Sequence, residues 1–332
     1  MRACAALALS GGYSTMGRQA AAGLRAWADA REVALRIEDD RSEPERSARL
    51  LGALAGAADL VFGPYGSGPA RAVAGEMAGR PEVVWNHGGA AVPRTGARLV
   101  DVLGPADRYW QGLPPALEAL GEGGSPVAVA RCPGVFGADV AAGAQRALAA
   151  AGRGGAPVLD LDPAEPGACA RAALEAGARW LVGGGRAEDD LALARALGGT
   201  GLRAGLVVCG VALAAEELGD AVAGWIGPAQ WAPGGPPPPL PLPPGSDYPA
   251  AQALAAGLLA ERAAELAGST RPDDLWDAAR AMRASTFLGP FAVDEEGRQT
   301  AHAPLIVAWR GRAAGLRREV VWRPEGSERL PA

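Results

Sequence analysis

Residues 60–89 constrain the fold of this chain more than any other stretch, because two apolar runs enclose a helix there. The first run, Leu60 to Phe62, breaks into the turn-rich loop Gly63-Pro64-Tyr65-Gly66-Ser67-Gly68. Pro69 then opens an alanine-rich helix, and proline suits the first helical position because its missing N–H would be unpaired there. The second run, Val83 to Trp85, ends in Asn86-His87-Gly88-Gly89. The stretch predicts a strand–loop–helix–strand–loop unit with parallel strands.

The two loops of this unit are candidates for a ligand site. Both follow strands, and small ligands bind at the carboxyl ends of the strands in open α/β sheets. The helix start at Ser67, Gly68 and Pro69 also offers backbone N–H groups and a positive dipole end to an anion. Because any βαβ unit shares this pattern, the spacing alone leaves a binding role and a purely structural role open.

The alternation of strands and helices continues along the chain. A helix is expected over Pro44 to Leu54, with Ser42 as its cap. Further strands are expected at residues 33–38, 98–103, 127–131, 158–161, 180–182, 206–209 and 222–226, with helices between most of them. Such alternation predicts parallel sheets covered on both faces. Two successive runs in 332 residues predict two lobes rather than one core.

Charge and cysteine content exclude several classes of protein. The net charge is −5 with acids and bases mixed, so no basic surface for nucleic acid is expected. The four cysteines, Cys4, Cys132, Cys169 and Cys209, lie far apart without metal-ligand spacing. No apolar run reaches the roughly 18 residues of a membrane-spanning helix, so direct membrane insertion is not expected.

Two further stretches have more than one interpretation. Residues 3–12, ACAALALSGG, have the character of a weak signal peptide, but they run straight into a loop and an amphipathic helix and are assigned as the first strand. The chain therefore starts where a mature protein would start; either a signal was removed or the protein stays in the cytoplasm. Residues 232–245, APGGPPPPLPLPPG, predict an extended connector, with a docking segment for an SH3-type groove as the alternative.

The loop Gly63 to Ala70 resembles the ligand loop of type I periplasmic solute-binding proteins of ABC transporters, the branched-chain amino-acid-binding family. The strand at residues 33–38, which runs into Asp39-Asp40, resembles the second strand of that family, and Gly104 to Gly112 resembles its first crossing between lobes. Residues 286–311, with Leu288-Gly289-Pro290-Phe291, resemble its closing hairpin. The resemblance covers nearly the whole chain in the same order.

This resemblance implies an α/β fold of two Rossmann-like lobes, joined by a three-stranded hinge, with a ligand cleft between the lobes. The expected first lobe comprises residues 1–107 and 228–300, and the expected second lobe comprises residues 108–227 and 301–332. Ligand contacts are expected from loops of both lobes and from the crossings, namely Tyr13, Met16, Tyr65, Ser67, Asn86, His87, Gly88, Gly89, Tyr109, Phe136, Arg186 and Trp231.

No catalytic or cofactor constellation accompanies these residues. The two histidines are His87, in the expected ligand loop, and His302, which is expected at the surface, and no GxSxG elbow is present. The pairs Asp39-Asp40, Asp189-Asp190 and Glu216-Glu217 are expected to be solvated. After Gly183-Gly184-Gly185 a dinucleotide fingerprint would need glycine where Glu188 stands, and no Walker pattern occurs. We therefore expect no enzyme, no cofactor and no metal.

The chain departs from the family at one expected ligand contact. Amino-acid-binding members carry an acidic residue for the ligand ammonium after the strand that matches residues 206–209, whereas this chain has Gly210-Val211-Ala212. An unpaired ammonium in a closed cleft is unfavourable. A free α-amino acid is therefore not the expected ligand, and Arg186 favours an anionic or neutral polar one.

The resemblance implies a solute-binding protein that closes on a small polar or carboxylate-bearing molecule, such as an amino-acid derivative, an amide or an aromatic or organic acid. It would deliver this molecule to the membrane permease of an ABC importer. The implied location is periplasmic or extracytoplasmic, lipid-anchored or secreted. Because Tyr65-Gly66-Ser67 also resembles the Tyr-x-Ser loop of cytoplasmic amide sensors, a cytoplasmic sensor that acts on a regulatory protein is the alternative. An enzyme on the same scaffold is a second alternative.

Overall fold

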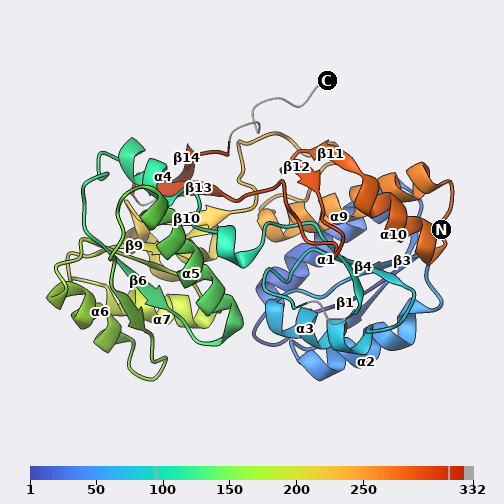
Figure 1. Ribbon diagram of the computed structural model, residues 1–332, viewed down its shortest axis with the longest axis horizontal. Helices are drawn as coiled ribbons and strands as arrows, with labels where there is room; N and C mark the ends of the chain where they lie inside the picture. Colours follow the sequence, from blue (N-terminus) through green and yellow to red (C-terminus); the bar gives the residue numbers. More distant parts are fainter. Residues whose placement is uncertain (94–95, 313–314, 325–332) are drawn as a thin grey trace. The chain divides into compact units, whose positions relative to one another are not determined.

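The computed structural model describes residues 1–93, 96–312 and 315–324, which form two compact units (Figure 1). The first unit contains residues 1–105 and 234–302. The second contains residues 106–233 and continues from Ala303 to the last described residue. Within the described residues, the chain therefore passes between the units three times.

The first unit is built on a five-stranded parallel sheet in the order β2-β1-β3-β4-β5. Its strands are β1 (Arg2–Leu7), β2 (Ala34–Asp39), β3 (Leu60–Phe62), β4 (Val83–Asn86) and β5 (Arg98–Asp101). The central strands β3 and β4 are buried throughout, which is typical of parallel strands covered on both faces. Because β3 and β4 are parallel neighbours, the loops that follow them leave the sheet at the same edge, next to each other.

Five helices and a hairpin complete the first unit. The helices are α1 (Ser14–Ala30), α2 (Pro44–Ala55), α3 (Ser67–Glu76), α9 (Tyr248–Ala267) and α10 (Pro272–Ala281), and the hairpin is β11 (Arg283–Thr286) with β12 (Gly289–Ala292). Helix α2 packs on α3, and α1 packs on α9 although they lie far apart in the sequence (Figure 1). Trp27 of α1 meets Phe62 of β3 edge to face, with ring centroids 5.3 Å apart. These contacts build the apolar core around the sheet.

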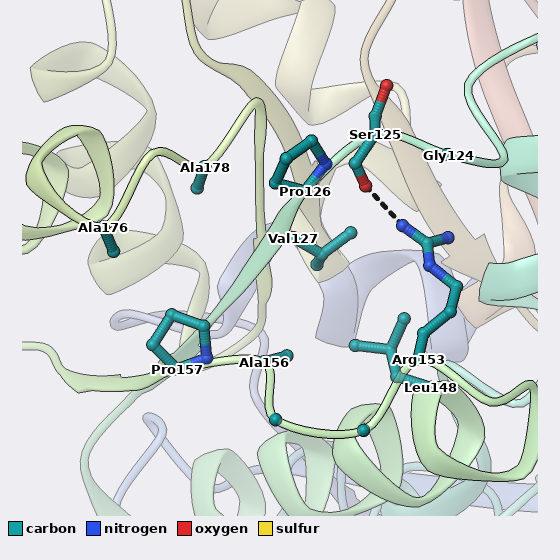
Figure 2. Close-up of a pocket in the computed structure, with 12 residues that line it drawn as sticks. Gly124, Ser125, Pro126, Val127, Leu148, Arg153, Ala156, Pro157, Ala176 and Ala178 are labelled. Atoms are coloured by element: carbon teal, nitrogen blue, oxygen red, sulfur yellow. Dashed lines mark hydrogen bonds between the residues drawn. The ribbon is translucent and has the colours of Figure 1, made fainter.

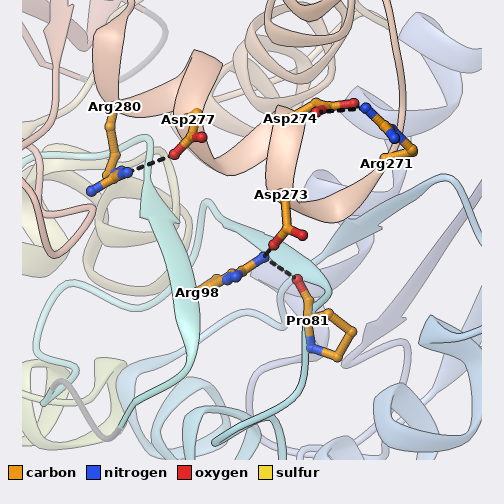
Figure 3. A network of polar contacts seen from close by, with 7 residues as sticks. All are labelled: Pro81, Arg98, Arg271, Asp273, Asp274, Asp277 and Arg280. Atoms are coloured by element: carbon orange, nitrogen blue, oxygen red, sulfur yellow. Dashed lines mark hydrogen bonds and ion pairs between the residues drawn. The ribbon is translucent and has the colours of Figure 1, made fainter.

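Helix α10 is tied to the sheet by a polar network at its first turn (Figure 3). The Arg98 guanidinium at the start of β5 lies 2.7 Å from an Asp273 carboxylate oxygen and donates to the Pro81 carbonyl oxygen at 3.1 Å. Asp273 is largely exposed, so the ion pair contributes on the order of 0.2–1 kcal/mol. Its role is to orient the helix rather than to stabilise the core.

The second unit contains a seven-stranded mixed sheet in the order β14-β13-β10-β9-β8-β6-β7. Strands β6 (Val127–Arg131), β7 (Val158–Asp160), β8 (Trp180–Gly183), β9 (Arg203–Leu206) and β10 (Ile226–Ala229) run parallel. Strands β13 (Leu305–Arg310) and β14 (Arg317–Trp322) add an antiparallel end. The helices are η1 (Ala106–Arg108), α4 (Leu113–Ala119), α5 (Gly134–Ala150), α6 (Pro166–Glu175), α7 (Ala187–Ala196), η2 (Val207–Gly210), α8 (Leu213–Leu218) and η3 (Gly219–Val222).

The predicted α/β fold with parallel-dominated sheets in two lobes is confirmed, and several local predictions are corrected. Strand β9 ends at Leu206, so the strand expected over residues 206–209 is mostly the 3-10 turn η2. Strand β10 begins at Ile226, where the predicted strand was to end. Helix α3 begins at Ser67, two residues before Pro69. Ser42 does not cap α2, because the N-cap is Glu43 without a side-chain hydrogen bond.

Residues 232–245 form no regular helix or strand, as their prolines predict. Among the helices of the described residues, none has the length and apolar character required to cross a membrane. The predicted hinge and the ligand cleft between the lobes stay predictions.

Candidate functional site

The loops after β3 and β4 are joined into one piece at the carboxyl edge of the first unit. The Gly66 N–H donates to the Gly88 carbonyl oxygen at 2.9 Å, and Tyr65 pairs with Gly88 as an isolated parallel bridge. The Ala91 N–H donates to the Ser67 hydroxyl oxygen at 3.2 Å. The expected ligand loops are therefore a continuous backbone surface rather than two independent loops.

Glycine is required at two positions of this surface. Gly66 has φ of +100°, a conformation that side chains with a Cβ rarely adopt. A Cβ on Gly88 would lie 2.4 Å from the Pro64 carbonyl oxygen, so a side chain there would separate the two loops. The glycines thus serve the close approach of the two loops.

Asn86 and His87 lie beneath this surface. Asn86 is 1% exposed; its amide nitrogen donates to the Gly89 carbonyl oxygen and to an Asp101 carboxylate oxygen, each at 2.7 Å. His87 is completely buried, and burial lowers the pKa of its imidazole to about 4, so the ring is neutral at pH 7. Both residues shape the loop from within. Their contact with a ligand stays a prediction.

The partly exposed side chains at this edge are Tyr13, Tyr65 and Ser67. The Tyr13 ring lies against Gly66, since a Cβ there would be 3.3 Å from Tyr13 Cε2. Met16, in the first turns of α1, is 9% exposed. No side chain caps the first N–H groups of α3, which begins at Ser67. The edge therefore combines aromatic surface, a hydroxyl group and the uncapped start of a helix.

In the second unit the expected contacts are partly brought together. Tyr109 and Phe136 meet edge to face with ring centroids 5.5 Å apart, and Phe136 remains half-buried at the start of α5. Trp231, which follows β10, is 8% exposed and packs as a core residue. Tyr109 and Phe136 therefore form one aromatic pair, and Trp231 presents little surface.

Arg186 differs electrostatically from the sequence expectation. Its guanidinium lies 2.9 Å from an Asp189 carboxylate oxygen and 3.0 Å from one of Glu188. The two carboxylates balance its charge, although about half of the Arg186 side chain is exposed. The prediction that Arg186 favours an anionic ligand therefore loses its electrostatic basis.

Of the three carboxyl pairs expected to be solvated, Glu216 and Glu217 are exposed as predicted, whereas Asp39-Asp40 and Asp189-Asp190 are partly or fully buried. Asp190 is completely buried and accepts the Gly185 N–H at 2.7 Å and the Val208 N–H at 2.9 Å. Loss of hydration outweighs these two bonds and raises its pKa to about 7. Asp190 thereby links the loop after β8 to η2. Asp189 and Asp40 are also buried, and Asp40 accepts the Ser47 hydroxyl at 2.7 Å.

Three structural residues escaped the sequence analysis. His302 is 3% exposed rather than at the surface, and burial lowers its pKa to about 4. The polar roles of Asp190 and Asp40 were also missed. The available signal was position, since Asp40 directly follows β2 and Asp190 lies in the first turn of the helix that follows the glycine loop after β8.

The segment that lacks the ammonium-binding acid is held rigidly. The Trp309 indole N–H donates to the Cys209 carbonyl oxygen at 2.9 Å, and the Arg318 guanidinium donates to the Gly210 carbonyl oxygen. Asp190 is the carboxylate that bonds to η2, and both of its oxygens are occupied by backbone N–H groups. It is thus not available to pair with a ligand ammonium.

The described residues contain no cluster of three or more His, Cys, Asp or Glu side chains that fits a metal ion. All four cysteines are free and buried, and burial raises the pKa of Cys4 to about 12 and that of Cys169 to about 11. Thiol chemistry therefore has no reactive group here.

The sequence model of a family described as periplasmic binding protein matches residues 5–314. No curated protein sequence matches the chain. Among solved structures, a leucine-binding protein LivK from Thermotoga maritima has 16% identity and a TM-score of 0.79, covering 98% of this chain and 99% of that one.

Two structures with bound ligands are also similar to this chain. A solute-binding protein of an ABC transporter from R. palustris, in complex with 4-hydroxybenzoate, has 17% identity and a TM-score of 0.79, covering 97% of this chain and 96% of that one. LivJ from Streptococcus pneumoniae, in complex with isoleucine, has 12% identity and a TM-score of 0.74, covering 97% of this chain and 99% of that one. At these identities the likeness shows the fold alone.

Proposed function

The chain belongs to the periplasmic binding protein family, and from this premise we propose that it is the solute-binding component of an ABC importer. The proposed ligand is a small carboxylate-bearing molecule without an ammonium group, such as an aromatic or organic acid. The proposed partner is the membrane permease of that importer, and the proposed location is extracytoplasmic. No catalytic step is part of this role.

The observation that carries the proposal is the joined edge of the first unit. Tyr65 and Ser67 are partly exposed there, and the first N–H groups of α3 have no side-chain cap. An uncapped helix start favours an anion through both its free N–H groups and its dipole. We assign the ligand carboxylate to this edge, with Tyr13 and Tyr65 as aromatic walls and the Tyr65 hydroxyl group as a donor to the carboxylate.

The second unit supports an acid rather than an amino acid. Gly210-Val211-Ala212 offers no acidic side chain, and both oxygens of Asp190 accept backbone N–H groups. Burying an ammonium without a partner would oppose binding. The Tyr109–Phe136 pair is proposed as apolar contact for the body of the ligand. The R. palustris protein in complex with 4-hydroxybenzoate shows that this fold accommodates such an acid.

Calorimetry tests the ligand class directly. We expect 4-hydroxybenzoate or benzoate to bind at least tenfold more tightly than leucine or isoleucine, because only the amino acids carry an ammonium. Tight binding of leucine would refute the proposal. The protein is unfolded and refolded before titration, so that a co-purified ligand does not mask the result.

A matched pair of tyrosine variants tests the site. Tyr65→Phe removes a hydroxyl group at the proposed edge, and Tyr248→Phe removes one from a buried position in α9. We expect Tyr65→Phe to weaken acid binding about tenfold, the scale of a hydrogen bond to a charged group, and Tyr248→Phe to leave it unchanged. Equal affinities for the two variants would remove Tyr65 from the site without deciding the ligand class.

The second candidate, a cytoplasmic amide sensor, rests on the Tyr65-Gly66-Ser67 pattern, whose two side chains are both partly exposed. Short aliphatic amides therefore belong in the same titration series. Binding of acetamide or propionamide with no binding of acids would favour the sensor over the importer component.

A further inference from the structure

The amino edge of the sheet in the second unit carries a hollow of about 260 Å³ (Figure 2). Three loops that enter the parallel strands border it: residues 120–126 between α4 and β6, residues 151–157 between α5 and β7, and residues 176–179 between α6 and β8. Phe136 and Arg186 follow the opposite, carboxyl ends of β6 and β8. The hollow is therefore separate from the proposed solute site.

The walls of the hollow are mostly apolar. Leu148 of α5 and Val127 at the start of β6 are buried side chains that line it, and Pro126, Pro157 and Ala156 complete the wall. The volume corresponds to about eight or nine water molecules at roughly 30 Å³ each. It lies just below the range of about 300–1,000 Å³ for pockets of drug-sized ligands. A molecule the size of a single substituted ring or a short aliphatic chain matches it.

One cationic side chain, Arg153, lines this apolar space. One Nη atom of its guanidinium donates to the Ser125 carbonyl oxygen, and Figure 2 shows the side chain running along one side of the hollow to that bond. The other, Nη1, is buried without a hydrogen-bond partner. A buried N–H group of a charged side chain is unfavourable until it finds an acceptor. Arg153 therefore has an unused donor beside an apolar hollow.

The nearby acid does not neutralise Arg153. Glu122 lies 2.8 Å from the Arg179 guanidinium and 3.1 Å from that of Arg203, and its carboxylate also accepts the Ser125 hydroxyl. Within the described part of the chain, no carboxylate forms an ion pair with Arg153. Glu122 is thus engaged by two other guanidinium groups and by a hydroxyl group.

The helix ends at this edge do not supply an acceptor for Arg153 either. The Leu148 carbonyl oxygen of α5 accepts the Arg153 backbone N–H at 2.8 Å, and the Ala173 carbonyl oxygen of α6 accepts the Ala178 N–H at 3.0 Å. These carbonyl groups are satisfied by the loops that follow them. The unpaired Arg153 donor is left for an external acceptor.

We propose that this hollow is a second ligand site, which binds a small monocarboxylate with an apolar body. The carboxylate accepts from the Arg153 guanidinium, whose unpaired Nη1 is brought to it by a rotation of the partly exposed side chain, and the body packs on Leu148 and Val127. A polyanion such as phosphate fits less well, because a single unpaired donor and an apolar wall cannot replace its hydration. The site does not depend on the proposed importer function, since no residue is shared.

Amide-resolved NMR of the full chain, titrated with benzoate to about 20 mM, tests the proposal. Gly124, Gly154 and Gly155 report on the hollow, whereas Gly66 and Gly88 report on the proposed solute site. We expect saturable shifts at the hollow glycines and binding of benzyl alcohol, a neutral analogue of similar size, that is at least tenfold weaker. The two sets of reporters separate failure here from failure of the proposed function.

Two variants and a control complete the test. Arg153→Gln removes the guanidinium, and Ala156→Leu fills the hollow; each should weaken benzoate binding at the hollow glycines at least tenfold. Arg171→Gln removes an arginine of α6 that is paired with Glu165 outside the hollow, and it should change nothing. Absence of saturable shifts at these glycines, or equal binding to the wild type and Arg153→Gln, would overturn the proposal.

Discussion

Replacing Gly23 by alanine tests the packing of α1 on α9, because helix propensity and tertiary packing predict opposite signs. In an isolated helix, alanine is more favourable than glycine by about 1 kcal/mol. In this fold, a Cβ on Gly23 would lie 2.0 Å from the Ala250 carbonyl oxygen and 3.0 Å from the Leu254 backbone nitrogen of α9. Backbone atoms cannot rotate away, so the two helices would have to move apart.

The expected magnitude follows from the two opposing terms. Overpacking a core costs typically about 1–3 kcal/mol, and contact with rigid backbone belongs at the upper end of that range. Separation of the helices also loosens Trp27, which packs so closely on Gly257 of α9 that a Cβ there would lie 2.5 Å from the indole. After subtraction of the propensity gain, we expect Gly23→Ala to destabilise the first unit by about 2 kcal/mol.

Native-state hydrogen exchange of α1 and α9 amides measures this loss without interference from the second unit. A loss of about 2 kcal/mol corresponds to roughly thirtyfold faster exchange. Gly75→Ala in α3 is the matched control, because no atom lies within 4 Å of its Cβ position and its φ is not positive. It should slow exchange. If Gly23→Ala slowed exchange like the control, the close approach of α1 and α9 would be wrong.

Two pH dependences with opposite signs follow from the buried titratable groups. As the pH rises from about 4 to about 7, the second unit should lose stability, because the unfolded Asp190 carboxyl ionises near 4 while burial raises its folded pKa to about 7. Urea titrations of the wild type and Asp190→Asn at three pH values measure the free energy of unfolding. If that free energy changed with pH equally in both proteins, the prediction would be contradicted. The first unit should lose stability as the pH falls from about 6.5 to about 4, because burial lowers the pKa of His87 and of His302 to about 4. NMR titration of the imidazole protons checks it, and titration near 6.5 in the folded protein would contradict it.

Most of the fold was predictable from the sequence, because its determinants are local. The buried runs Leu60–Phe62 and Val83–Asn86 are apolar and bounded by turn residues, and their shortness separates them from the helices. The errors occur where local character was ambiguous. Val207 to Cys209 is an apolar segment with two β-branched residues, as in a strand, yet it forms a 3-10 turn. There the Val208 N–H donates to the Asp190 carboxylate of α7 and not to a neighbouring strand.

The candidate site divides in the same way. The glycine-rich loops at residues 63–68 and 86–89 are local features, and the sequence placed them after neighbouring parallel strands. Whether a polar residue in or near such a loop faces outward depends on partners far along the chain. Asp190 is buried because two backbone N–H groups, one of them 18 residues away, compensate its charge.

The sequence by itself thus determined the order of the strands and helices and the loops that meet at one sheet edge, since periodicity and turn residues are local. Only the tertiary structure decided which polar groups are accessible. It left the Arg186 charge balanced, buried His87 and His302 in neutral form, and left one Arg153 donor unpaired. The physical reason is that burial and hydrogen-bond partners are set by residues distant in the chain, which no local pattern encodes.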